Sequence, residues 1–187
     1  MPTKPPSPRE RLLETAVRLF YSEGIHTVPV DRLVTEAEVT RATFYRHFPT
    51  KEDLVVAYLR ATDTRLRAAV EAAVAEAESD QGVSALLDLI GEVTCSAGFR
   101  GCHFINAAAE YPNASDPVRE AIAEHRAWFQ ETVTDLAAKA GHPDPDHAGR
   151  VLVLLHDGAL SSAGLDAPEA VRVTVRRAGR DLLGLPD

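Results

Sequence analysis

The chain has 187 residues, of which 45% are hydrophobic and 26% are charged, and its formal net charge is -8. These values exclude a disordered or collagen-like chain, and the length allows one sizeable domain or a small module joined to a larger one. The sequence has no apolar run near the roughly 18 residues that a membrane-spanning helix needs, and the N-terminus MPTKPPSPRE lacks the apolar segment of a secretion signal. We therefore expect a cytoplasmic protein with no membrane partner.

The charge is unevenly distributed along the chain. Residues 1–60 hold nine Lys and Arg against eight Asp and Glu, whereas residues 61–187 carry a net charge of -9. Binding of a polyanion requires basic side chains that neutralise phosphates. Any contact with nucleic acid is therefore expected in the first third of the chain.

The first predicted helix follows a Pro-rich arm over residues 1–7. Ser7 with Glu10 three residues later has the form of a capping box, and Pro8 between them suits a first helical position. Gly24 stands where a glycine commonly ends a helix. The sequence therefore predicts a helix from residue 8 to about residue 23.

Two short helices and a long one follow. The second helix is predicted over residues 30–37 with Pro29 in its first turn, and the third runs from about residue 41 to residue 47 with Thr40 as its cap. Thr50 and Asp53 resemble another capping box, which opens a long helix from Lys51 to about residue 78. Three short helices within 50 residues are typical of a helix-turn-helix unit, here residues 8–50.

Residues 51–187 are predicted to form a second, wholly helical domain. After the long helix, the SDQG segment at residues 79–82 is expected to start a helix that runs to about residue 98. Further helices are expected over about residues 102–111, 118–140, 146–163 and 168–183. Apolar residues recur at helical spacing, and strictly alternating runs typical of strands are not found. The sequence therefore predicts an all-α protein.

The third helix, with the sequence TRATFYRHF over residues 40–48, presents two faces. A helix advances about 100° per residue, so Phe44 and Phe48 fall on one face and are expected in the core. The opposite face carries Ala42, Thr43, Tyr45 and Arg46, while Arg41 and His47 flank the core face. Small residues at the centre of an exposed helix allow close approach to DNA, which favours a helix that enters the major groove.

Residues 9–59 resemble the DNA-binding region of TetR-family bacterial transcriptional regulators. The resemblance rests on RERLLETAVRLFYSEGIHTVPVDRLVTEAEVTRATFYRHFPTKEDLVVAYL and above all on its segment TFYRHFPTKEDL. Residues 60–187 match the family in length and helical character, and GCHFINAAAEYP resembles a segment of one group of these proteins. The resemblance identifies the chain as a member of this family.

The resemblance implies an Ω-shaped homodimer that binds a palindromic double-stranded DNA operator, usually as a repressor that a small-molecule inducer releases. By position, Arg41, Ala42, Thr43 and Tyr45 are implied to contact bases or the nearby backbone. The same comparison implies that His47 and Lys51 contact phosphate. Arg46 joins this set of DNA-binding residues from the helical face analysis.

Four residues depart from the family pattern. Glu38 occupies the turn of the helix-turn-helix unit, where the family usually has a glycine that tolerates a positive φ. Pro29 and Val30 stand where hydroxyl residues often anchor phosphate, a role for which Thr27 is a substitute. Asp31 lies close to the same surface and either repels phosphate or serves as an N-terminal helix charge.

The last two helices are expected to form the dimer interface, because a two-fold DNA site requires a two-fold protein. The alternative is that their apolar faces only complete the core of one chain. The interface candidates are Leu152, Leu155, Ala159, Leu160, Val171, Val175, Ala178 and Leu182.

A pocket for an apolar, neutral or cationic inducer is expected in the second domain, because basic residues that would anchor an anion are scarce there. For each candidate, burial in a satisfied core is the competing interpretation. The candidates are Phe99, Cys102, His103, Phe104, Asn106, Tyr111, His125, Trp128 and His156. No cofactor and no metal site are expected.

Two alternatives depend on the cysteines. Cys95 and Cys102 allow a DNA-binding regulator that senses thiol oxidation or a metal, although their spacing is not a zinc signature. An enzyme that uses Cys102 as a nucleophile is the other alternative, but the sequence has no nucleophile elbow, phosphate loop or metal-ligand motif. We expect a regulator and not an enzyme.

Overall fold

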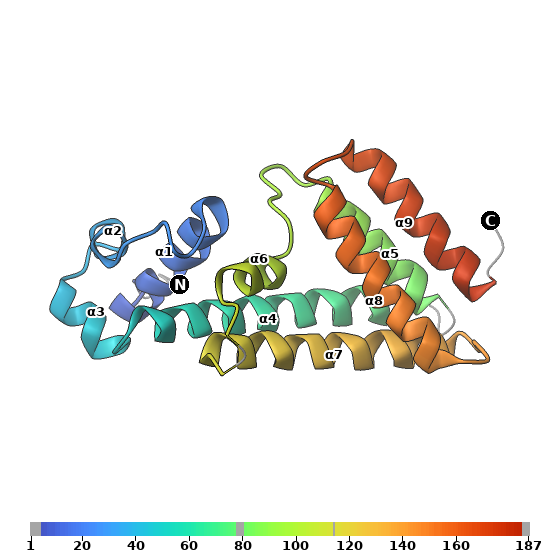
Figure 1. Ribbon diagram of the computed structural model, residues 1–187, viewed down its shortest axis with the longest axis horizontal. Helices are drawn as coiled ribbons and strands as arrows, with labels where there is room; N and C mark the ends of the chain where they lie inside the picture. The colour runs from blue at the N-terminus through green and yellow to red at the C-terminus, as the bar shows by residue number, and fades with distance from the viewer. Residues whose placement is uncertain (1–4, 78–80, 114, 185–187) are drawn as a thin grey trace. The chain divides into compact units, whose positions relative to one another are not determined.

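The fold is all-α, as the sequence predicts. A computed structural model describes residues 5–77, 81–113 and 115–184. Within these residues it contains nine α-helices and no strands (Figure 1). The helices are α1 (Pro8–Glu23), α2 (Val30–Glu36), α3 (Arg41–His47), α4 (Lys51–Ala75), α5 (Gly82–Thr94), α6 (His103–Glu110), α7 (Pro117–Lys139), α8 (Pro145–Ser162) and α9 (Pro168–Leu183).

The predicted helix starts are confirmed where a cap marks them. Ser7 accepts from the backbone N–H of Glu10 while the Glu10 carboxylate accepts from the Ser7 N–H, which completes the first capping box. Thr50 and Asp53 exchange the same pair of bonds at the start of α4. Side-chain caps thus fix these boundaries locally, as their spacing predicts.

Three predicted helix boundaries need correction. The helix expected to reach about residue 78 ends at Ala75, and the helix expected to reach about residue 98 ends at Thr94. Glu76 and Ala77, which are good helix formers, follow the first of these ends, so propensity alone does not mark the stop there. Pro29 is the N-cap of α2 and not part of its first turn. The helix predicted to start in the SDQG segment at residues 79–82 begins at Gly82 with Gln81 as its N-cap, while residues 79–80 lie outside the described residues.

The described chain divides into two compact units. One comprises the residues up to Asp63 together with Asn106–Ile122, and the other comprises Thr64–Ile105 together with Ala123–Asp187. The division falls inside α4, α6 and α7. These units are defined by packing, so the functional division into residues 1–7, 8–50 and 51–187 remains a prediction.

In the first unit, α1, α2 and α3 pack against one another. Phe44 of α3 is fully buried and Phe48 is 3% exposed, so the predicted core face of α3 is confirmed. Phe20 of α1 meets Tyr58 of α4 edge-on, with their ring centroids 5.6 Å apart. The apolar face of the short α3 is therefore anchored on a core that α1 and α4 complete.

In the second unit, α5, α8 and α9 pack side by side (Figure 1). The close approach of α5 and α9 depends on glycines. A Cβ at Gly179 would lie 2.4 Å from Cδ1 of Leu87, and a Cβ at Gly91 would lie 2.4 Å from Cγ of Arg172. Real Cβ atoms do not approach other atoms this closely, so a larger residue at either position would separate the two helices.

In the described part of the chain, no helix combines the length and the apolar character that crossing a membrane requires.

Candidate functional site

The outward face of α3 is the first candidate site. Tyr45 is 45% exposed although its neighbour Phe44 is fully buried, because about 100° of helix separates the two side chains. Ala42 and Arg46 are also exposed, and Thr43 is half-buried. Thr40 begins the helix by accepting from the backbone N–H of Thr43. A short capped helix thus presents one aromatic ring, two small residues and a guanidinium.

The turn before α3 contains Glu38 at the position where a positive φ was expected. Glu38 has a φ of 53°, and it is the one residue other than glycine with a positive φ among the described residues. The Arg11 guanidinium of α1 donates to the carbonyls of Ala37 and Glu38, at 2.9 and 3.1 Å. These two bonds tie the turn to α1 and help to maintain a conformation that glycine adopts more readily.

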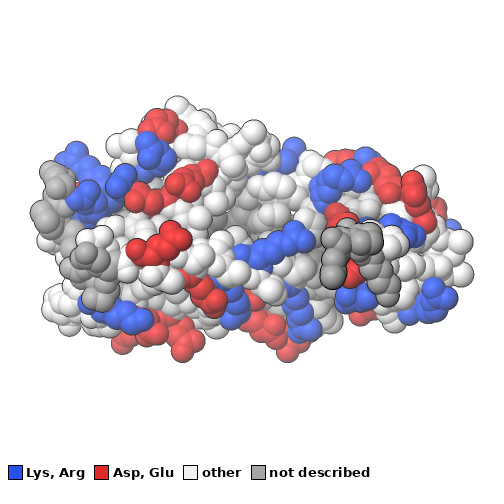
Figure 2. Space-filling model, turned by 180° about the vertical axis from the view of Figure 1, so that it is seen from behind, with Lys and Arg blue, Asp and Glu red and all other residues white. Residues whose placement is uncertain are grey.

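Ion pairs surround α2. Glu36 pairs with Arg18 at 2.5 Å and with Arg32 at 2.8 Å, and Arg32 also pairs with Glu23. These hydrogen-bonded cations lower the pKa of Glu36. Figure 2 shows basic and acidic side chains interspersed over the face that it draws. Most charges of α2 are therefore engaged within the unit.

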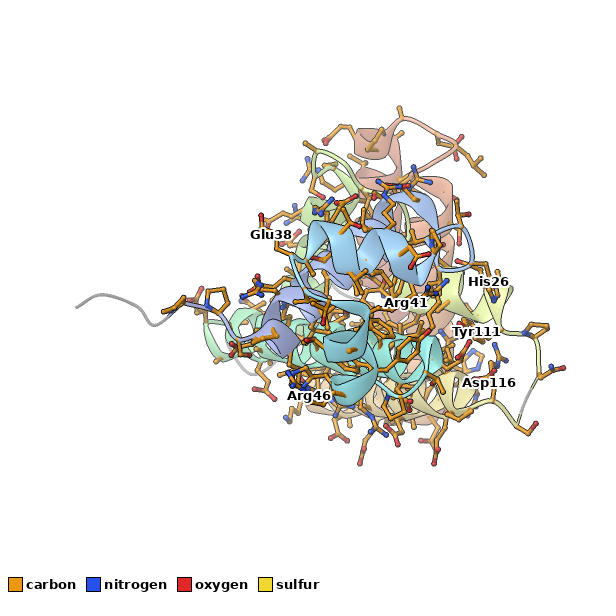
Figure 3. The ribbon with its side chains drawn as sticks, turned by 90° about the vertical axis from the view of Figure 1, so that its left-hand side faces the viewer. His26, Glu38, Arg41, Arg46, Tyr111 and Asp116 are labelled. Carbon is orange, nitrogen blue, oxygen red and sulfur yellow. The ribbon has the colours of Figure 1, made fainter. Side chains whose placement is uncertain are left out.

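The two arginines of α3 differ in their surroundings. Arg41 lies 3.3 Å from the carboxylate of Asp31 in α2, measured from Nη1 to Oδ1. Arg46 makes no ion pair with any described residue. Figure 3 shows Arg41 and Arg46 at opposite ends of the helix. One guanidinium is thus oriented by a partner while the other is available to a ligand.

Lys51, a predicted phosphate ligand, is the first residue of α4, and its side chain contacts the protein's own backbone. Its ammonium donates to the carbonyl of Ile25 at 2.5 Å and lies 5.8 Å from the centre of the Phe20 ring. Burial lowers the pKa of this lysine. His47, the other predicted phosphate ligand, has its Nε2 atom buried without a hydrogen-bond partner in the described structure. Phosphate contact by either side chain remains a prediction.

Glu110 makes contacts that the sequence did not predict. Its carboxylate accepts from the backbone N–H groups of Ile25 at 2.8 Å and His26 at 2.6 Å, and it also lies 3.2 Å from the His26 ring. The His26 ring stacks on Tyr111 with their centroids 5.0 Å apart (Figure 3). The end of α6 therefore holds the turn that connects α1 to α2.

Most of the predicted inducer ligands lie in the second unit, and four of them belong to a cluster of rings. His125 is buried and stacks on Phe104, with centroids 3.7 Å apart and planes 4° apart. Trp128 lies 5.6 Å from His125, and the ring of Phe129 lies 4.3 Å from that of His156. The cluster thus brings Phe104, His125, Trp128 and His156 together.

Charged groups border this cluster. His156 contacts Asp157 at 3.0 Å, and Arg126 pairs with the same carboxylate at 2.6 Å. Burial alone would raise the pKa of Asp157, but the hydrogen bonds from His156 and Arg126 lower it. Trp128 carries the Arg67 guanidinium 4.6 Å above its ring and lines a groove of about 200 Å³ with Val70, Glu71, Val74, Thr132, Asp135, Leu136 and Lys139.

The remaining predicted inducer ligands are Phe99, Cys102, His103, Asn106 and Tyr111. Asn106 and Tyr111 belong to the first unit, where Asn106 is exposed and burial raises the pKa of Tyr111 to about 12. Phe99 and Cys102 pack partly buried against the core of the second unit. Burial lowers the pKa of His103 to about 4, so its ring is neutral at pH 7. Contact of any of these residues with an inducer remains a prediction.

The two cysteines have different surroundings. Cys102 is half-buried, and burial raises the pKa of its thiol. Because the thiolate is the reactive form, this shift disfavours reaction at neutral pH. Cys95 is exposed, with its sulfur 4.0 Å from a carboxylate oxygen of Glu169. Among the residues that the structure describes, no group of three or more His, Cys, Asp or Glu side chains is placed to hold a metal ion.

The predicted dimer residues fall into two groups. Leu152, Ala159, Leu160, Val171 and Val175 are already buried by the packing of one chain. Leu155, Ala178 and Leu182 are partly exposed. A groove of about 480 Å³ between α8 and α9 is lined by Leu155, Ala159, Val171 and Val175 together with the exposed Leu154. The strongly exposed apolar side chains of this region are Leu154, Leu165 and Val173.

Comparison with known proteins points to one family. Residues 12–58 match the sequence profile of the bacterial regulatory proteins of the tetR family. The crystal structure of a TetR-family transcriptional regulator from Streptomyces coelicolor is 48% identical in sequence and superposes with a TM-score of 0.91. That match covers 95% of this chain and 94% of the other chain.

Curated relatives give the same result over shorter stretches. The HTH-type transcriptional regulator LmrA of Bacillus subtilis is 30% identical over 125 residues, which cover 64% of this chain and 66% of LmrA. The HTH-type transcriptional regulator TcmR of Streptomyces glaucescens is 33% identical over 63 residues, or 34% of this chain and 28% of TcmR. The chain thus spans about two thirds or less of the length of these relatives.

Proposed function

Because the chain belongs to the TetR family of bacterial transcriptional regulators, which bind DNA and are not enzymes, we propose that it is a homodimeric repressor of a palindromic operator. One observation carries this proposal: α3 presents Tyr45, Thr43 and Ala42 outward while Phe44 anchors the helix in the core. A capped helix with small central residues and an aromatic edge fits the major groove. Binding to chromosomal DNA would place the protein in the cytoplasm.

The proposed contacts have two kinds. Ala42, Thr43 and Tyr45 contact base edges, and Arg41 reaches the bases from the start of the helix. Arg46 neutralises phosphate, because its guanidinium is exposed and makes no ion pair within the described chain. His47 and Lys51 contact phosphate as secondary partners.

We propose a small apolar, neutral or cationic inducer that contacts the ring cluster of the second unit. Its support is the collection of Phe104, His125, Trp128 and His156 beside the Asp157 carboxylate. Aromatic faces favour a cation or a neutral aromatic compound over an anion, while the Asp157 carboxylate is already paired with Arg126. A thiol-based sensor is less well supported, because burial raises the pKa of Cys102.

We propose that a second copy of the chain covers the groove between α8 and α9. Leu154 supports this, since it lines the groove and is 67% exposed, and large apolar side chains at an exposed groove often mark an interface. A two-fold dimer would present two copies of α3 to successive major grooves.

The test of the operator proposal begins with double-stranded DNA selected by the wild-type protein from a library with a randomised core. Tyr45→Ala and Thr43→Ala are each expected to lower the affinity for the selected duplex about tenfold or more, and to leave binding to a scrambled duplex unchanged. Glu14→Ala, an exposed change on α1, is the matched control. Unchanged affinity in both α3 variants would show that the outward face of α3 does not contact the bases.

A salt titration tests the phosphate contact separately. Arg46→Ala is expected to weaken binding to all duplexes and to reduce the slope of log affinity against log salt concentration by about one. Lys51→Ala is a poorer probe, because it also removes the bond to the Ile25 carbonyl. An unchanged salt slope for Arg46→Ala would remove this residue from the DNA interface.

A further inference from the structure

Asp31 and Arg41 form an ion pair that links α2 to the start of α3. The Nη1 and Oδ1 atoms are 3.3 Å apart, and the two side chains remain 62% and 70% exposed. Neither residue makes a second ion pair within the described chain. Figure 3 shows Arg41 on the side of α3 that lies beside α2. The pair therefore stands at the surface that we propose for DNA binding.

Other acidic residues near α2 are directed elsewhere. Glu36 pairs with Arg18 and Arg32, and Glu23 pairs with Arg32. Asp31 lies in the first turn of α2, and its carboxylate is directed to α3 instead. Asp31 therefore contacts α3, the helix that we propose enters the major groove, and does not link α1 to α2.

An exposed ion pair contributes little to folding stability, because water and salt screen the two charges. Its effect on DNA binding is larger for two reasons. A carboxylate beside the recognition helix repels the phosphates of any duplex, whatever its sequence. The same carboxylate holds the guanidinium in one direction, which reduces the entropy lost when Arg41 forms a directed contact.

We propose that Asp31 is a specificity-determining residue that positions Arg41 for bidentate contact with a guanine in each half-site. A guanidinium offers two parallel N–H donors, which match the O6 and N7 acceptors of guanine in the major groove. This inference rests on the proposed function, since it requires that α3 enters that groove. Asp31 keeps Arg41 from non-specific contact with phosphate, whereas Arg46 supplies that contact from the other end of the helix.

The proposal predicts that removal of the Asp31 carboxylate raises the affinity for non-specific DNA and lowers the discrimination between bases. Without the carboxylate, Arg41 is free to bind any nearby phosphate, so binding to unrelated DNA becomes stronger. At the same time the guanidinium loses its fixed direction, so discrimination at one base pair per half-site becomes weaker. A residue that only repelled DNA would change all affinities by the same factor.

The experiment compares the full-length wild-type protein with Asp31→Asn, Arg41→Ala and the double variant. Each protein selects duplexes from the randomised library, and binding constants are measured for the wild-type selected duplex, its single-base-pair variants and a scrambled duplex. Glu14→Gln is the control, because it removes one exposed carboxylate from the same unit without touching Arg41.

In the expected result, Asp31→Asn binds the scrambled duplex several-fold more tightly than the wild type. Its preference for guanine at one position in each half-site falls a few-fold, that of Arg41→Ala falls about tenfold, and preferences elsewhere are retained. The double variant shows the same loss of preference as Arg41→Ala alone, because the two residues act through one contact. Glu14→Gln keeps every base preference.

Two results would overturn the inference. In the first, Asp31→Asn strengthens binding to all duplexes equally and keeps each base preference, so that Asp31 acts only as a repelling charge. In the second, Arg41→Ala keeps the guanine preference, so that Arg41 reads no base. Failure of the proposed function looks different, because the wild-type protein itself would then select no sequence from the library.

Discussion

Glu38, in the turn between α2 and α3, adopts a backbone conformation that is unusual for a residue with a side chain. Its φ of 53° lies in the left-handed region, which costs a residue with a Cβ about 1 kcal/mol or more. The chain retains this conformation because the Arg11 guanidinium donates to the carbonyls of Ala37 and Glu38. Contacts from α1 thus stabilise a turn that the local sequence disfavours.

Glu38→Gly is expected to stabilise the protein by about 0.5–1 kcal/mol, because glycine adopts a positive φ without strain although it gains freedom in the unfolded chain. The measurement is the midpoint of urea unfolding. Glu38→Ala serves as the control, since it removes the carboxylate but keeps the Cβ, and it should leave the stability nearly unchanged. A stabilisation of equal size in both variants would assign the effect to charge instead.

The buried and exposed faces of α3 could be predicted at the level of residues because the required information is local. The positions of Phe44 and Tyr45 follow from the helical period, and the cap at Thr40 follows from its side chain. The bond between Lys51 and the Ile25 carbonyl could not be predicted in this way, because it joins residues 26 positions apart. Only the packed structure shows that this lysine is partly engaged.

At the level of elements, the boundaries of capped helices were predicted better than the packing contacts between helices. Ser7 and Glu10 mark the start of α1, and the structure confirms both hydrogen bonds. Helical spacing also identified the apolar faces of α8 and α9, yet it could not tell which part would be buried within one chain. Val175 is buried against the unit's own core, whereas Val173 two residues earlier is 55% exposed.

The contact between α6 and the turn after α1 is a second feature that depends on the tertiary fold. Glu110 and Ile25 are 85 positions apart in the sequence. A glutamate at the end of a helix belongs to no sequence pattern that predicts which distant backbone N–H it will accept from. The two accepted N–H groups belong to the connection that precedes α2. Glu110, Ile25 and His26 all belong to the first compact unit, so this contact is part of the packing of that unit.

Glu110→Ala is expected to destabilise this turn by about 1–3 kcal/mol, because two backbone N–H groups lose a charged acceptor. Hydrogen exchange measures the effect directly, and the amides of Ile25 and His26 should exchange about tenfold faster or more. Glu120→Ala, an exposed change on α7, is the control and should leave both amides protected. Unchanged exchange in Glu110→Ala would show that the turn is held by other contacts.

At the scale of the whole molecule, His103 links stability to pH. Burial lowers its pKa to about 4 in the folded protein, whereas an unfolded chain has a histidine pKa near 6.5. The unfolded state therefore binds more protons between these values, so stability falls as the pH falls from about 6.5 towards 4. From pH 7.5 to pH 5 this group alone costs up to about 2 kcal/mol.

His103→Gln should remove this loss, because glutamine remains polar but does not titrate. Urea unfolding at pH 7.5 and pH 5 is the measurement, and the variant should lose up to about 2 kcal/mol less than the wild type. His147→Gln, which replaces an exposed histidine of α8, is the matched control. Equal acid sensitivity in the wild type and His103→Gln would mean that His103 is protonated to the same extent in both states.

The proposed dimer is tested at the scale of the whole molecule. Leu154 is 67% exposed and lines the groove between α8 and α9, so a charge there should disfavour a partner copy without disturbing the core. Leu154→Glu is expected to weaken dimerisation about 100-fold, because a desolvated carboxylate without a partner is costly in an interface. Light scattering after size exclusion measures the change, and Ala72→Glu on the exposed face of α4 is the control. Because the proposed function assigns one half-site to each copy of α3, the Leu154→Glu monomer should also bind the selected operator more weakly than the wild-type dimer. A Leu154→Glu protein that remains dimeric would place the interface elsewhere.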